Sequence, residues 1–254
     1  VLGSRGLGDV YKRQPAGNGI RFTLTVPDVN LPSVSSRTMT GTGTAKKEDE
    51  IKTVDILVFD MSKTPAVFLE WGSATGVTQD LADNSTVSFS AVLSPTTAST
   101  CIVVVANKEL DNIVSGFTKG ATTKVEAMEK MLHTQTGKWL ADGSTTGGYT
   151  RIPMYGEKVI SKITPSMDPI TGINMKRMLA RIDIRNNSAT SNFTVEEVYL
   201  ANYNTTGYIA PAWNTNGQVT DPVPDTPVLP AGSGKMTEEG DAILYSVNGN
   251  TPYD

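Results

Sequence analysis

The stretch that decides the fold is IKTVDILVFD, residues Ile51–Asp60. Three of its apolar side chains alternate along one face, in the period of a β-strand: Val54, Ile56 and Val58. Leu57 and Phe59 add apolar side chains on the opposite face. A strand that is apolar on both faces is typical of the centre of a sheet. The pattern therefore predicts a central strand.

Other strand-like segments lie on both sides of this one. Residues 20–26, IRFTLTV, place Ile20, Phe22, Leu24 and Val26 on one face, and residues 101–107, CIVVVAN, form a continuous buried run. Further strands are expected within residues 66–72, 85–93, 151–163, 173–186 and 193–203. The 23 glycines and 14 prolines punctuate these segments with turns. The chain therefore reads as an all-β sandwich.

Helix is expected only in short pieces. Thr123 and Glu126 have the spacing of a capping box, and Val125, Met128, Met131 and Leu132 follow as an apolar stripe. His133 is expected on the same helix, and residues 108–114 are expected to form another short turn. One or two short helices therefore accompany the strands.

Composition limits the classes of function. The net charge is −4, and the lysines and arginines are spread along the chain, which argues against nucleic-acid binding. The single cysteine, Cys101, reads as a small buried apolar residue, and no disulfide can form within the chain. No apolar run has the length of a membrane span.

The sequence predicts three regions. Residues 1–14, VLGSRGLGDVYKRQ, resemble translated adapter sequence from metagenomic reads and are expected not to be native. Residues 15–186 are expected to form an N-terminal β-sandwich domain, bounded by the polar run NNSATSN. Residues 187–254 are expected to form a partial C-terminal β domain, with a long loop over residues 211–240 that contributes little to a core. The chain is thus expected to be a fragment with both native termini missing.

The residues offer little support for an enzyme. His133 is the only histidine, so no histidine-rich metal site is expected, and no serine or cysteine has an evident partner base. We expect no catalytic, metal or cofactor-binding residues and no cofactor. Trp71, Trp139 and Trp213 suit either a sugar-binding platform or packing at the edges of the core, and packing is favoured.

One basic residue stands out between the first two strands. Arg37 lies in SSRTMTGTG, residues 35–43, a run of Ser, Thr and Gly that precedes the charged run KKEDE. The simplest interpretation is a solvated loop residue. An exposed, extended link is also what a protease requires of its substrate.

Four segments together resemble the fimbrillin family of Bacteroidales, the lipoprotein-derived type V pilins and their minor tip and anchor relatives. These segments are SSRTMTGTG, EDEIKTVDILVFD, IVVVANK and RMLARIDI, in this order, and the resemblance covers about residues 20–186. It implies a transthyretin-like, two-domain β-sandwich, with the second domain truncated here. It also implies a structural subunit of a cell-surface fimbria that supports adhesion.

The resemblance further implies a route of assembly. Family members are exported as lipoprotein precursors held at the outer membrane by an N-terminal lipid, and an arginine-specific protease cuts between the first two strands. On this pattern Arg37 is the cut site and Thr38 the new N-terminus, and the first strand is released. A strand from a neighbouring subunit then takes its place. The implied partners are other pilin subunits, the protease, and host or bacterial surface ligands.

Simple energetics agree with this order of events. Burial of Ile20, Phe22, Leu24 and Val26 is worth about 6–12 kcal/mol as an upper bound. A whole domain is stable by only about 5–15 kcal/mol. Loss of the strand without replacement therefore predicts an unstable domain. The alternative reading is an uncleaved adhesin, anchor or glycan-binding lipoprotein on the same fold.

Overall fold

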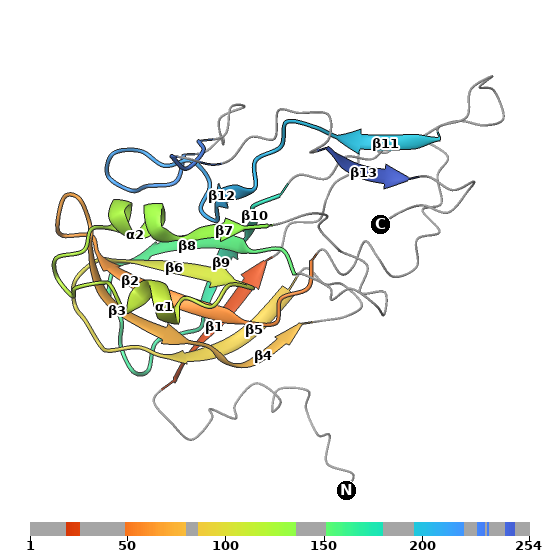
Figure 1. Ribbon diagram of the computed structural model, residues 1–254. Coiled ribbons are helices and arrows are strands. Elements are labelled where there is room, and N and C mark those ends of the chain that lie inside the picture. Colours follow the sequence, from red (N-terminus) through yellow and green to blue (C-terminus); the bar gives the residue numbers. More distant parts are fainter. Residues whose placement is uncertain are drawn as a thin grey trace, which may run out of the picture.

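A computed structural model describes residues 19–25, 49–79, 86–135, 151–179, 196–220, 228–231, 233 and 242–246. Strands dominate these ranges, with two short helices, in agreement with the predicted all-β sandwich (Figure 1). Residues 1–14 and the proposed boundary near residue 186 lie outside the described residues, so the division into domains stays a prediction.

The larger sheet has five strands in the order β10-β8-β6-β2-β3, all antiparallel to their neighbours. Its strands are β2 (Val54–Asp60), β3 (Val67–Ser73), β6 (Thr100–Ala106), β8 (Met154–Ile160) and β10 (Lys176–Arg177). Strand β2 lies inside the sheet between β6 and β3, as its two apolar faces predict. The prediction of an internal strand over residues 51–60 is therefore confirmed.

The smaller sheet has four strands in the order β4-β5-β1-β9. Its strands are β1 (Gly19–Thr25), β4 (Thr75–Gln79), β5 (Thr86–Val92) and β9 (Ile170–Asn174). Strand β1 runs antiparallel to β5 and parallel to β9. The first strand of the chain is thus an inner strand of its sheet, with a neighbour on each side.

Two short pairs of strands complete the described sheets. Strand β7 (Leu132–Thr134) pairs with β12 (Thr206–Tyr208), and β11 (Glu197–Leu200) pairs with β13 (Ile243–Ser246). Figure 1 shows each pair as neighbouring arrows drawn from distant parts of the chain.

The larger sheet is buried on both faces. Its inner face packs on the smaller sheet through one apolar core, to which β2 contributes Val54, Ile56 and Val58. Its outer face carries a second core, to which β2 contributes Leu57 and Phe59. Alternate side chains of β2 therefore enter two different cores, one on each face of the larger sheet, as the sequence pattern predicts.

Helices cover part of the outer face. Helix α1 (Asp111–Val114) and helix α2 (Lys124–Lys130) follow β6, and Ala127 and Met128 of α2 are buried in the outer core. The predicted capping box is confirmed, because the Thr123 hydroxyl accepts from the Glu126 amide and the Glu126 carboxylate accepts from the Thr123 amide.

The prediction of His133 on a helix is wrong. Helix α2 ends at Lys130, and Met131 leaves the helical conformation with φ −80° and ψ 79°. His133 lies instead in β7, opposite Gly207 of β12. The helix stops because residues 132–134 pair with a strand more than seventy residues later, a contact that local periodicity cannot reveal.

Residues after β12 also cover the outer face, which corrects the expectation of a long loop with little core content. Ala212 is buried, and Trp213 and Val219 pack against the outer core. An ion pair holds this segment, since Lys124 Nζ lies 2.6 Å from Glu157 Oε2 and also donates to the carbonyl of Gly217. The Val219 amide donates to the other Glu157 oxygen at 3.3 Å. The buried ammonium group of Lys124 is therefore paired with a partly buried carboxylate.

A glycine allows the two sheets to approach each other at β8. A Cβ added to Gly156 would lie 2.7 Å from Met175 Sδ, 2.8 Å from Ile173 Cγ2 and 3.1 Å from the Asn174 carbonyl oxygen. These distances are shorter than van der Waals contact, and one of the atoms belongs to the backbone.

We therefore expect Gly156→Ala to lower the free energy of unfolding by about 1–3 kcal/mol, the usual cost of overpacking. Urea denaturation followed by circular dichroism measures the change. Gly116→Ala is the matched control, because its Cβ would lie 3.6 Å from the nearest atom outside its neighbours, the carbonyl oxygen of Ile113. Equal stability of the two variants would contradict the close approach at Gly156.

Candidate functional site

The candidate site is the slot between β5 and β9 that β1 occupies. Towards β5, Ile20, Phe22 and Leu24 stand opposite Ala91, Phe89 and Val87. Towards β9, Phe22 and Leu24 stand opposite Ile170 and Ile173. Backbone pairing on both sides means that removal of β1 would split the sheet rather than shorten it.

Side chains of β1 fill the inner core. Ile20 is 4% exposed, Phe22 1% and Leu24 0%. The ring of Phe22 stacks on that of Phe89 at a centroid distance of 4.9 Å and an interplanar angle of 6°. Burial of these three side chains is worth about 5–9 kcal/mol, as an upper bound. Strand β1 therefore supplies a large part of what stabilises the sandwich.

The opposite face of β1 is polar. Arg21 and Thr23 are half-buried and Thr25 is exposed, while Thr86 and Ser88 of the neighbouring β5 are exposed on the same side. The slot therefore requires of its occupant one apolar face and one polar face, in alternation.

The β9 side of the slot is irregular. Two residues, Thr171 and Gly172, lie between the positions that pair with Phe22 and Leu24, so β9 carries a β-bulge opposite Thr23. Gly172 has a φ of +71°, which favours glycine. The bulge fixes the register of β1, because only one alignment matches the extra residue.

Arg37, Thr38 and Val26 lie outside the described residues, as does the whole link over residues 26–48. The structure therefore describes the two ends of this link. At the first end, the Met175 amide donates to the carbonyl of Thr25 at 2.9 Å. Arg37 is midway in sequence between Thr25 and Asp49.

The second end of the link is held by two ion pairs. The guanidinium of Arg177 contacts the carboxylate of Asp49, and both side chains are 14% exposed. Arg151 reaches the two carboxylate oxygens of Glu50 through Nε at 3.1 Å and Nη2 at 3.3 Å. We name Asp49–Lys52 the anchor segment, because four side chains from distant parts of the chain hold it: Gln79, Asn107, Arg151 and Arg177.

The backbone of the anchor segment is held as firmly as its side chains. Gln79 donates to the Asp49 carbonyl at 2.8 Å and accepts from the Ile51 amide at 2.9 Å. Asn107 donates to the Glu50 carbonyl at 2.8 Å and accepts from the Lys52 amide at 2.9 Å. No local pattern predicts this anchor, because its partners lie between 28 and 128 residues away along the chain.

The residues considered for catalysis do not assemble into a reactive group. Cys101 is buried in β6, and burial raises the pKa of its thiol to about 12, so the thiol is protonated at neutral pH. Burial also lowers the pKa of His133 in β7. Within the described ranges, no three His, Cys, Asp or Glu side chains gather as a metal site.

The described tryptophans pack against the outer core. Trp71 of β3 and Trp213 are both partly buried there, and Trp213 makes an edge-to-face contact with Tyr208 at 4.9 Å. Trp139 lies outside the described residues. This packing favours the structural interpretation of Trp71 and Trp213 over a sugar platform.

No helix in the part of the chain that the structure describes is long and apolar enough to cross a membrane.

The contribution of β1 to stability is directly measurable. We expect Phe22→Ala to lower the free energy of unfolding by about 3–5 kcal/mol, because it removes the ring that stacks on Phe89 and leaves a cavity. Thr25→Ala, on the exposed side of the same strand, is expected to change it by less than about 0.5 kcal/mol. Urea denaturation measures both. A Phe22→Ala variant as stable as the control would show that β1 is not an integral part of the core.

Comparison with known proteins gives an independent result. No curated protein matches the chain significantly. The family model of the major fimbrial subunit protein (FimA) matches residues 20–191, well over half of the chain, and this match begins within β1. The chain, an all-β sandwich with β1 inside its smaller sheet, belongs to the family of the major fimbrial subunit protein and is a structural subunit of a fimbria.

Proposed function

We propose that this subunit polymerises by strand replacement, after an arginine-specific protease cuts between Arg37 and Thr38. The observation that carries the proposal is the position of β1 inside its sheet, paired on one side with β5 and on the other with β9. A slot emptied of β1 would have unpaired backbone groups on both sides, and another extended strand can pair with both rows at once.

The cut changes how β1 is held. In the intact chain the link tethers β1 to β2, so β1 is always present at a high effective concentration next to its slot. After the cut, only the backbone pairing and the buried side chains of Ile20, Phe22 and Leu24 retain it. Displacement by another strand of similar pattern then costs little, because the contacts that are lost are replaced as they break.

The occupant of the slot is a strand of a neighbouring subunit. Its side chains alternate apolar and polar, with three apolar positions that take the places of Ile20, Phe22 and Leu24. The middle position lies against the ring of Phe89, where an aromatic or large aliphatic side chain packs best. Each such strand links two subunits, so repetition builds a filament.

The anchor segment keeps the rest of the domain intact during the exchange. Asp49, the first described residue after Thr38, pairs with Arg177, and the backbone of the anchor segment is held by Gln79 and Asn107. Release of β1 is therefore expected to leave β2 and the larger sheet in place.

The same proposal covers the cellular setting. The subunit is exported as a lipoprotein precursor, attached to the outer membrane through an N-terminal lipid, and assembled at the cell surface, where the filament supports adhesion to host or bacterial ligands. Support comes from the family match and from the resemblance of the residue pattern. It acts as a structural protein and not as an enzyme.

The cut is tested with variants of two arginines that precede the larger sheet. An arginine-specific protease is expected to convert the parent chain to a product that begins at Thr38 and forms filaments. Arg37→Lys is expected to block both steps, because the protease does not cut after lysine. Arg13→Lys is the matched control. It is expected to be cut after Arg37 and to form filaments as the parent does, because a cut after Arg13 would leave β1 attached to the domain. N-terminal sequencing and electron microscopy give the readouts.

Two outcomes would overturn the proposal. A parent chain that the protease leaves intact at Arg37 would assign the subunit to the uncleaved anchor or adhesin role. Filaments from Arg37→Lys, in the same yield as from the parent, would show that assembly does not need the cut.

Occupation of the slot is tested with a peptide of the first strand, GIRFTLTV, residues 19–26. An excess of this peptide is expected to slow polymerisation of the cleaved protein, because it refills the slot. The same peptide with Phe22→Asp is the control, since a carboxylate against the ring of Phe89 is strongly disfavoured. Light scattering measures the rate. Equal rates with both peptides, alongside normal filament growth, would place the subunit contact outside the slot.

A further inference from the structure

A protein that accepts strands faces a general hazard, because any open sheet edge also accepts them. The following inference rests on the proposed function, in which a partner's strand enters the slot of β1. The smaller sheet ends in β4 on one side and β9 on the other, each paired with a single described strand. These two edges differ from the slot in their backbone and in the side chains beside them.

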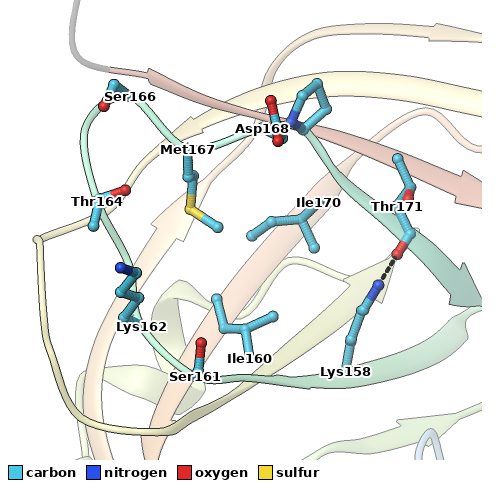
Figure 2. A pocket seen from close by; sticks show the side chains of 11 residues that line it. Lys158, Ile160, Ser161, Lys162, Thr164, Ser166, Met167, Asp168, Ile170 and Thr171 are labelled. Carbon is cyan, nitrogen blue, oxygen red and sulfur yellow. Dashed lines mark hydrogen bonds between the residues drawn. The ribbon is translucent and has the colours of Figure 1, made fainter.

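The edge at β9 is closed by a lysine from the other sheet. Lys158 of β8 extends across the side of the sandwich and its Nζ donates to the carbonyl of Thr171 in β9 (Figure 2). Figure 2 also shows the hollow beside this contact, lined by Lys162 and Ile170 among others. A strand added at β9 would have to displace this ammonium group or bury its charge, and burial of an unpaired charge is costly.

The backbone of β9 reinforces this closure. Its bulge at Thr171 and Gly172 interrupts the regular spacing of amides and carbonyls in a strand of only five residues. A Cβ at Gly172 would lie 3.6 Å from the Nζ of Lys158, so the left-handed glycine and the lysine lie together. Short length, a bulge and an inserted lysine are three recognised ways to protect an edge.

The edge at β4 repeats part of this design. Strand β4 also has five residues, and its pairing with β5 shifts register between Thr75 and Thr78. The shift contains Gly76, with a φ of +64°, just as the shift in β9 contains Gly172. Both outer strands of the smaller sheet are therefore bulged at a left-handed glycine.

One edge of the larger sheet is covered as well. The outer side of β3 is covered by the segment before α2, since Phe68 donates to Thr122 and accepts from Gly120 at 2.7 Å each. At the other edge, within the described ranges, the two residues of β10 pair only with Tyr155 and Met154 of β8. The bulged, closed edges are thus a property of the smaller sheet, the one that holds the slot.

We infer that both edges of the smaller sheet are built to refuse strands, and that Lys158 is the specificity-determining residue that closes β9, so a partner's strand enters this sheet only at the slot of β1. The slot and the β9 edge border the same strand. Without closure of the outer edge, an incoming strand would pair with β9 from the wrong side, and subunits would associate before the protease has acted.

The test uses the full chain carrying Arg37→Lys, so that cleavage plays no part. Lys158→Thr is expected to shift the main species in sedimentation velocity from monomer to dimers and larger assemblies, with a rise in thioflavin T fluorescence. Lys162→Thr is the matched control, because Lys162 lines the same hollow on the connection between β8 and β9, and it is expected to remain monomeric.

A second variant guards against a folding defect. Lys158→Ala opens the same carbonyl without a β-branched side chain, and circular dichroism confirms that each variant is folded. Lys158→Arg retains the charge and a donor, and it is expected to restore the monomer.

Folded Lys158→Thr and Lys158→Ala proteins that stay as monomeric as the control would overturn the inference, as would an Arg37→Lys parent that already associates. Because no cut and no released strand are involved, failure of filament growth after cleavage leaves this result unaffected.

Discussion

Burial of both faces of β2 and β6 is the constraint on which the rest of the structure depends. Seven of seven residues in β6 are buried, and six of seven in β2. Such strands require a separate cover on each side, because neither face tolerates water. The outer cover comes from the helices and from residues 209–219, and the inner cover is the smaller sheet. The smaller sheet thus covers the inner face of the larger sheet, and the two sheets share the inner core.

This arrangement is what the proposed exchange of β1 requires of a stable domain. Strand β1 contributes to the inner core alone, while the outer core, the β2–β6 ladder and the ion pairs and hydrogen bonds of the anchor segment involve none of its residues. The subunit therefore holds two kinds of structure: a framework of long antiparallel strands, and a strand, β1, inserted into the sheet that covers it. The proposed specificity follows from the same arrangement, since the slot offers a partner strand on each side whereas an outer edge of the smaller sheet offers one, and that one is bulged.

Local patterns predicted the elements whose role is set by their own side chains. The alternation in residues 20–26 and 51–60 identified β1 and β2, and the spacing of Thr123 and Glu126 identified the start of α2. Long-range pairing decided the features that were missed. His133 is in a strand because residues 206–208 pair with it, and the anchor segment exists because Arg151 and Arg177 reach it from far along the chain. The bulges at Gly76 and Gly172 could not be predicted from the sequence either, because the presence of a glycine does not determine its φ angle.

The position of β1 between two strands has a mechanical consequence. In the filament proposed above, the strand in each slot would carry any tension between subunits. Tension along a strand that is paired on both sides acts on two ladders in shear, so several hydrogen bonds and three buried side chains must yield together. A strand added to an outer edge would have one ladder, so fewer hydrogen bonds would resist the same pull. The interior slot is therefore the place in this sheet where a non-covalent joint is strongest under tension.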